Sequence, residues 1–213
     1  MPPASLPTTT LPPAPPYADQ RSAEILASVR VAFAEKGFDG ASMQDLARAA
    51  GISVGNFYRY FPSKAAIVEQ LIAHDLREMQ QEFTTALAAA DPLASLRQQV
   101  RAHLAEHQSC NDGQLWAEIT AAATRKPDIG LACLHMETTI AGYLTQVFAA
   151  VTGLSLDEVQ LRFAAHATFI VLLVKSGAMM APQENQARDD LNALILRTID
   201  QVLDDVASAR PKG

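Results

Sequence analysis

Residues 42–64 read Ser-Met-Gln-Asp-Leu-Ala-Arg-Ala-Ala-Gly-Ile-Ser-Val-Gly-Asn-Phe-Tyr-Arg-Tyr-Phe-Pro-Ser-Lys, and this stretch decides the fold that we expect. Ser42 suits the N-cap of a short helix, and Asp45 follows three residues later as a capping-box partner. Gly51 suits the end of that helix, because the left-handed residue that follows many helices costs least as glycine. Ser53 can then cap a second short helix. A helix, a tight turn containing glycine and another helix together predict a helix-turn-helix.

The second helix, expected from Val54 to Tyr60, has an apolar and a polar side. Phe57 and Phe61 are four residues apart, so both can face a core. The other side offers an amide, hydroxyls and a guanidinium, which suit phosphate oxygens and base edges. Residue types alone leave open an ordinary aromatic-rich core helix. The polar residues are Asn56, Tyr58, Arg59 and Tyr60.

The stretch from about Arg21 to Glu69 resembles the DNA-binding domain of the TetR family of bacterial transcriptional repressors. The resemblance rests on Phe33-Ala34-Glu35-Lys36-Gly37-Phe38-Asp39-Gly40, Ser42, the turn Ala47 to Ser53, Gly55-Asn56-Phe57-Tyr58-Arg59-Tyr60-Phe61 and Lys64. It implies that the following residues stand at positions that meet DNA: Ser42, Gln44, Ser53, Val54, Gly55, Asn56, Tyr58, Arg59, Tyr60 and Lys64. By chemistry, Tyr58 and Lys64 suit phosphates, while Asn56 and Arg59 suit base edges.

The charge balance alone argues against nucleic acid, since the net charge is −6. Residues 1–70, however, hold six Lys or Arg and six Asp or Glu, so the whole excess of acid lies in the rest of the chain. A small positive patch on a neutral module is enough for phosphate contacts. Two cysteines and no visible signal peptide predict a cytoplasmic protein, and the apolar stretch from Phe163 to Met180 predicts a buried helix rather than a membrane span.

The periodicity predicts an all-α fold of about nine helices, with no strand pattern. Residues 1–18 contain seven of the twelve prolines and predict a disordered arm. We expect a helix-turn-helix domain over 19–64 and a ligand-binding and dimerisation domain over 65–213. A long helix starting at Lys64 would connect the two. Ser155 and Glu158 predict a second capping box, ahead of a helix that is apolar on nearly every side.

The last two helices resemble the pair through which the family dimerises, and their apolar surface is large for a monomer. We therefore expect a homodimer. The resemblance also implies a small-molecule cavity among the middle helices. Few charges are expected to point into it, which favours an uncharged or hydrophobic ligand. Its candidate wall residues are Phe83, Leu87, Leu104, His107, Trp116, Ile119, Met136, Ile140, Tyr143, His166 and Phe169.

Two further patterns leave other functions open. His103-Leu104-Ala105-Glu106-His107 matches the zinc-peptidase pattern H-x-x-E-H, and Cys110 continues the same helical face. This allows a metal-sensing regulator or, with much less support, a zinc hydrolase. Cys110 and Cys133 allow a thiol switch, although inert packing is the commoner role of such cysteines.

The sequence therefore predicts a ligand-responsive transcriptional repressor that is not an enzyme and needs no cofactor. It would bind a palindromic operator as a homodimer and leave it when a small-molecule effector binds. An activator or a dual regulator is compatible with the same residues.

Overall fold

Nine α-helices and no strand make up the part of the chain that the structure, a computed structural model, describes: residues 16–109, 112–180 and 186–209, with side chains over 21–105, 113–180 and 186–209. The predicted all-α fold is confirmed. The helices are α1 (Pro16–Lys36), α2 (Met43–Ala49), α3 (Val54–Tyr60), α4 (Lys64–Ala88), α5 (Pro92–Ser109), α6 (Asp112–Ala123), α7 (Pro127–Thr152), α8 (Leu156–Ala178) and α9 (Gln186–Ala207).

Serine side chains start the three helices of the expected DNA-binding stretch. Ser42 caps α2 in a complete capping box with Asp45, Ser53 accepts the backbone N–H of Asn56, and Ser63 accepts that of Ala66. Each cap satisfies an N–H group that a helix start leaves without an intrahelical partner. Gly51 ends the α2 turn at φ +66°, the left-handed conformation that favours glycine.

The first helix begins at Pro16, three residues before the expected start at Asp19. Proline is well suited to the first helical position, because its missing N–H would lack an intrahelical partner there. The expected arm therefore loses residues 16–18 to α1, and residues 1–15 lie outside the described part.

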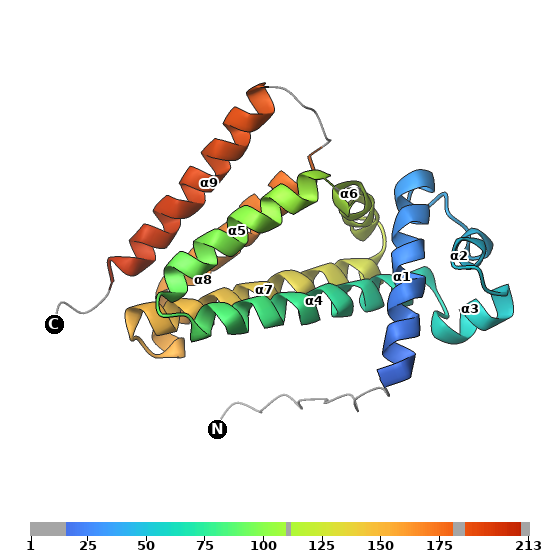
Figure 1. The fold of residues 1–213 in the computed structure, drawn as a ribbon, viewed down its shortest axis with the longest axis horizontal. Coiled ribbons are helices and arrows are strands. Elements are labelled where there is room, and N and C mark those ends of the chain that lie inside the picture. Colours follow the sequence, from blue (N-terminus) through green and yellow to red (C-terminus); the bar gives the residue numbers. More distant parts are fainter. Residues whose placement is uncertain (1–15, 110–111, 181–185, 210–213) are drawn as a thin grey trace.

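The long helices α4 and α7 lie side by side, with α8 packed against α7, while α1 crosses one end of this layer and carries α2 and α3 beyond it (Figure 1). Two hydrophobic clusters result. One joins α1, α2 and α3 to the first half of α4 and to α6 and α7, and the other joins α5, α7, α8 and α9. The first cluster crosses the expected domain boundary at 64/65, so the two expected domains share a continuous core.

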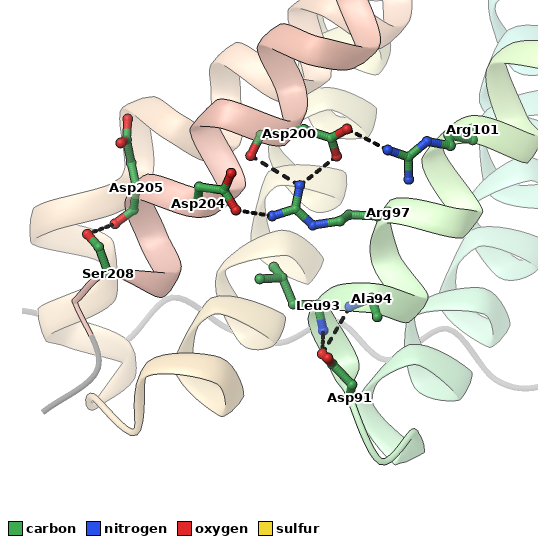
Figure 2. Close-up of polar contacts among 9 residues, drawn as sticks. All are labelled: Asp91, Leu93, Ala94, Arg97, Arg101, Asp200, Asp204, Asp205 and Ser208. Atoms are coloured by element: carbon green, nitrogen blue, oxygen red, sulfur yellow. Dashed lines mark hydrogen bonds and ion pairs between the residues drawn. The ribbon is translucent and has the colours of Figure 1, made fainter. Parts of the chain in front are cut away.

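Ion pairs attach α9 to α5 (Figure 2). The Arg97 guanidinium donates to the Asp200 carboxylate at 2.6 Å and to the Asp204 carboxylate at 2.5 Å, and Arg101 also pairs with Asp200. Figure 2 also shows Asp91 accepting two backbone N–H groups at the start of α5. The last helix is thus held by polar contacts on one side and by the second hydrophobic cluster on the other.

Helix α8 buries one face within the chain and leaves another apolar face exposed. Val159, Phe163 and Ile170 face the core, but Leu161 is 87% exposed and Leu172 is 55% exposed. Within the described residues, α8 is the one helix long and apolar enough to cross a membrane, which by itself is weak evidence for a membrane span. The exposed apolar side chains of α8 and α9 are Leu156, Leu161, Phe169, Leu172, Leu191 and Leu194.

Candidate nucleic-acid interface and ligand cavity

Helix α3 has a fully buried side and a solvent-facing polar side. Phe57 and Phe61 are 0% and 1% exposed, and their ring centroids lie 5.3 Å apart. On the opposite side, Tyr58 is 48% exposed and Tyr60 is 37% exposed. The two buried rings anchor the short helix to the core, and its polar groups remain exposed for binding. This arrangement presents hydrogen-bonding groups on a rigid element, as base reading in a groove requires.

Most of the residues predicted to meet DNA are on the surface. Ser42, Gln44, Ser53, Gly55, Asn56 and Arg59 are exposed, and Val54 is half-buried. Asn56, Arg59 and Tyr60 together line a shallow depression on α3. The predicted set is therefore brought together on one short helix and on the turn and helix start that precede it.

Lys64 has a different environment from the one that we expected. Its ammonium donates to the backbone carbonyls of Phe38 at 2.7 Å and of Asp39 at 3.1 Å, and it lies 5.4 Å from the centre of the Phe38 ring. Partial burial, together with the nearby charge of Lys126, lowers the pKa of Lys64. The start of α4 is thereby fastened to the segment that links α1 and α2.

The turn at Phe38 and Asp39 is also held from α6 and from the α6–α7 connection. The Glu118 carboxylate accepts the backbone N–H of Phe38 at 3.0 Å. Asp39 pairs with Arg125 at 2.7 Å and with Lys126 at 2.6 Å. These hydrogen bonds, that of Lys126 first, lower the pKa of the Asp39 carboxyl. We call this set of contacts the junction clamp.

Gly37, next to the clamp, is required by two constraints at once. Its φ is +74°, and a Cβ added to it would lie 3.1 Å from a Glu118 carboxylate oxygen. A larger residue would strain the backbone and push Glu118 away from the N–H of Phe38.

A cavity of about 410 Å³ lies among the middle helices, and it is of the size that small-molecule sites have. Four of the predicted wall residues line it: Phe83, Trp116, Met136 and Ile140. Much of the remaining wall is apolar and comes from α5, α7 and α8: Leu96, Val100, Leu144, Ile170, Val171, Val174, Ala178 and Met179.

The other predicted wall residues whose side chains are described do not line this cavity. Leu104 and Ile119 are buried in the two hydrophobic clusters. Leu87 and Phe169 are 36% and 41% exposed. Tyr143 packs against Phe83, with ring centroids 5.3 Å apart. The ring of His166 contacts Phe163 instead, and the side chain of His107 lies outside the described part.

The expectation of few charges in the cavity was wrong. Helix α4 contributes two stripes to the cavity wall. One contains Met79 and Phe83, and the other, one position earlier in sequence, contains Glu78 and Glu82. Arg30 pairs with Asp75, and Lys175 donates to Glu137 at 2.6 Å, so part of this charge is neutralised within the wall. The charged or titratable wall residues are Arg30, His74, Asp75, Glu78, Glu82, His103, Cys133, Glu137 and Lys175.

The residues behind the metal and thiol alternatives are separated or only partly described. His103 lines the cavity, whereas the side chains of His107 and Cys110 lie outside the described part. In the described part, one group of three potential metal ligands lies within 4.8 Å: His74, Asp75 and Glu78. Asp75 there already pairs with Arg30. Burial raises the pKa of the Cys133 thiol, which disfavours the reactive thiolate.

Neither the junction clamp nor the charged cavity wall was predicted from the sequence. The spacing of His74, Glu78 and Glu82, four residues apart, could have revealed a common polar helix face. No local signal marks Glu118 or Asp39, because Glu118 meets Phe38 across 80 positions of sequence and Asp39 meets Arg125 and Lys126 across 86 and 87.

Comparison with known proteins agrees with this arrangement. Residues 25–71 match the family described as "Bacterial regulatory proteins, tetR family". The regulator EthR of Mycolicibacterium smegmatis is 39% identical over 84 residues, which cover 38% of this chain and 39% of that protein. UidR of Escherichia coli is 25% identical over 122 residues, covering 57% and 61%. Both matches span less than two thirds of the relative.

Among solved structures, Salmonella enterica GusR superposes with a TM-score of 0.64 at 21% identity, covering 89% of this chain and 96% of that one. At this level of identity the likeness establishes the fold.

Proposed function

The chain belongs to the TetR family of bacterial regulatory proteins, and from that premise we propose that it is a ligand-responsive transcriptional repressor. It binds a palindromic operator in the cytoplasm as a homodimer and is released by a small-molecule effector. It is not an enzyme and carries no cofactor. The observation that carries this proposal is α3, a rigid helix whose buried rings support an exposed row of amide, hydroxyl and guanidinium groups.

The proposed DNA contacts divide into two classes. Asn56 and Arg59, exposed on α3, read base edges in the major groove. Tyr58 and the serines at the helix starts contact phosphates. Lys64 donates hydrogen bonds to the carbonyls of Phe38 and Asp39. It therefore acts first by positioning α4 against helices α1 to α3, which we call the reading module, and only secondarily on phosphates.

Dimerisation is supported by the exposed leucines of α8 and α9. Leu161, Leu172 and Leu194 are 87%, 55% and 47% exposed, and an apolar face of this kind is typical of a subunit interface. A two-fold pair formed through α8 and α9 would place two copies of α3 on one DNA duplex. The copies must lie roughly 34–36 Å apart to enter successive major grooves.

The route from effector to operator follows two continuous elements. Helix α4 starts at Lys64 against the reading module and carries Met79 and Phe83 into the cavity wall. Helix α6 carries Trp116 into the same wall and, two residues later, Glu118 to the backbone of Phe38. A ligand that displaces α4 or α6 therefore changes the position of α3, which couples the two sites.

The expected domains form part of this proposal: an arm, a reading domain from about 19 to 64 and a ligand-binding domain from 65 onward. The shared hydrophobic cluster across 64/65 supports the proposed coupling, since movement in one domain is not absorbed by a flexible linker.

The test is binding of the purified protein to DNA from upstream of its own gene, followed by fluorescence anisotropy. We expect a salt-sensitive complex and a protein that sediments as a dimer at micromolar concentration. Arg59→Ala should weaken specific binding by about 1–3 kcal/mol. The matched control is Arg77→Ala, which removes the same charge from an exposed position of α4.

Equal effects of Arg59→Ala and Arg77→Ala would contradict the base-reading role of α3. A monomer at micromolar concentration would contradict the paired-half-site mechanism.

A further inference from the structure

The cavity wall has a surplus of negative charge. Histidines counted as neutral, its four carboxylates exceed its two permanent cations, which gives a formal balance of −2. The carboxylates are Asp75, Glu78, Glu82 and Glu137, and the cations are Arg30 and Lys175. The four carboxylates and Lys175 lie beyond residue 70, in the part of the sequence that holds the whole net charge of −6.

Carboxylate oxygens gather around His74 on α4 at the edge of this cavity. The Nδ1 atom of His74 lies 3.6 Å from an oxygen of Asp75 and 3.8 Å from an oxygen of Glu78. That nitrogen is buried and has no hydrogen-bond partner among the described residues. Glu78 is 67% exposed, so its carboxylate stands where the cavity meets solvent. A ligand entering past this edge meets the exposed carboxylate of Glu78.

Other parts of the wall are apolar. Trp116 and Phe83 offer aromatic surface, and Ile140, Val171 and Val174 offer aliphatic surface. Aromatic faces attract cations as well as apolar groups. The cavity therefore presents an apolar chamber next to an acidic edge.

We propose that the effector is an amphipathic organic cation, whose apolar body lies against Trp116 and Ile140 and whose ammonium-type group lies at Glu78 and His74. This inference rests on the proposed effector role of the cavity. An anion would be repelled by the negative balance, and a neutral molecule would gain nothing from it. The proposal replaces the uncharged ligand that the sequence favoured.

Three probes of one shape test the sign of the charge: 1-adamantylmethylammonium, 1-adamantanemethanol and 1-adamantanecarboxylate. The chain has a single tryptophan, and it lines the cavity, so its fluorescence reports binding without interference from these non-absorbing probes. We expect the cation to bind about tenfold more tightly than the alcohol, and the carboxylate to bind most weakly. Titration calorimetry on the full chain gives an independent value.

Glu78→Gln tests the position of the charge. It should reduce the preference for the cation over the alcohol several-fold and leave binding of the alcohol unchanged. The matched control is Glu69→Gln, an exposed position on the same helix outside the cavity wall, which should leave the preference unchanged.

The proposal is overturned if the alcohol or the carboxylate binds as tightly as the cation, or if none of the three binds. It is also overturned if Zn²⁺ alone raises the melting temperature at micromolar concentration and His74→Ala abolishes that rise, because the acidic edge is then a metal site. Operator release is measured separately. A cation that binds but does not release DNA contradicts the repressor mechanism alone, whereas a neutral probe that releases DNA contradicts the ligand class alone.

Discussion

The polar face of α3 is carried by seven consecutive residues, whereas the cavity wall draws on six helices, from α1 to α8. In α3, the buried side chain that supports the helix and the side chains that face solvent lie within one short segment. In the cavity, each helix contributes a few positions, and their neighbours in sequence belong to the hydrophobic core. A surface of the first kind can be changed by single substitutions without disturbing packing. A cavity of the second kind is coupled to the stability of every helix around it.

The largest effect that distinguishes these regions should come from the core under α3. Phe57→Ala removes a side chain that is 0% exposed and should lower the free energy of unfolding by about 3–5 kcal/mol. Ile140→Ala, in the cavity wall, should cost less, because its side chain already borders empty space. Urea unfolding measures both. Equal losses would mean that Ile140 packs like a core residue and that the cavity does not open beside it.

The junction clamp should come next in size. Glu118→Ala leaves the half-buried N–H of Phe38 without its acceptor and should cost about 1–3 kcal/mol. Operator affinity should fall as well, because the turn that leads into α2 is released. Glu118→Gln keeps an acceptor oxygen and should restore most of both losses. If the glutamine variant behaves like the alanine variant, the carboxylate charge rather than the hydrogen bond is what matters.

Two tyrosines give a smaller and cleaner contrast. Tyr58→Phe removes one exposed hydroxyl from α3 and should weaken DNA binding by about 1 kcal/mol, by a similar factor on operator and unrelated DNA. Tyr143 packs against Phe83 and is not a wall residue, so Tyr143→Phe should leave DNA affinity unchanged. Anisotropy titrations on both DNAs are sufficient. A loss confined to the operator would assign Tyr58 to base reading instead.

The smallest effect should appear in acid, at the two capping boxes. Hydrogen bonds from Lys36 and Ser42 lower the pKa of Asp45, and those from Ser155 lower the pKa of Glu158. A carboxyl whose pKa is lower in the folded state stabilises the fold at neutral pH. This contribution is lost as the pH falls from the pKa of the unfolded state toward the pKa of the folded state. Asp45→Asn and Glu158→Gln should each flatten the fall of the melting temperature below about pH 4. Unchanged acid profiles would show that these caps contribute nothing measurable.

How far the fold was predictable depends on the range of the interactions. Helix starts at Ser42, Ser53 and Ser155 were predictable because a cap and its partner lie within three residues. The polar face of α3 was predictable for the same reason. The cavity wall was only partly predictable, since periodicity shows that a residue faces inward but not whether it meets a neighbour, as Ile119 does, or a void, as Ile140 does. Charged residues such as Asp75 and Glu137 were overlooked because their partners lie on other helices.

Gly113 limits how this protein can diverge in evolution. A Cβ at this position would lie 2.1 Å from the backbone oxygen of Ala178, so the backbones of α6 and the end of α8 touch directly there. The residue belongs neither to the proposed DNA-binding surface nor to the cavity wall. Any side chain on it must nevertheless force apart α6, which holds the junction clamp, and α8, which carries the proposed dimer face. Among descendants of this chain, lineages that change their operator or their effector should still inherit glycine at position 113.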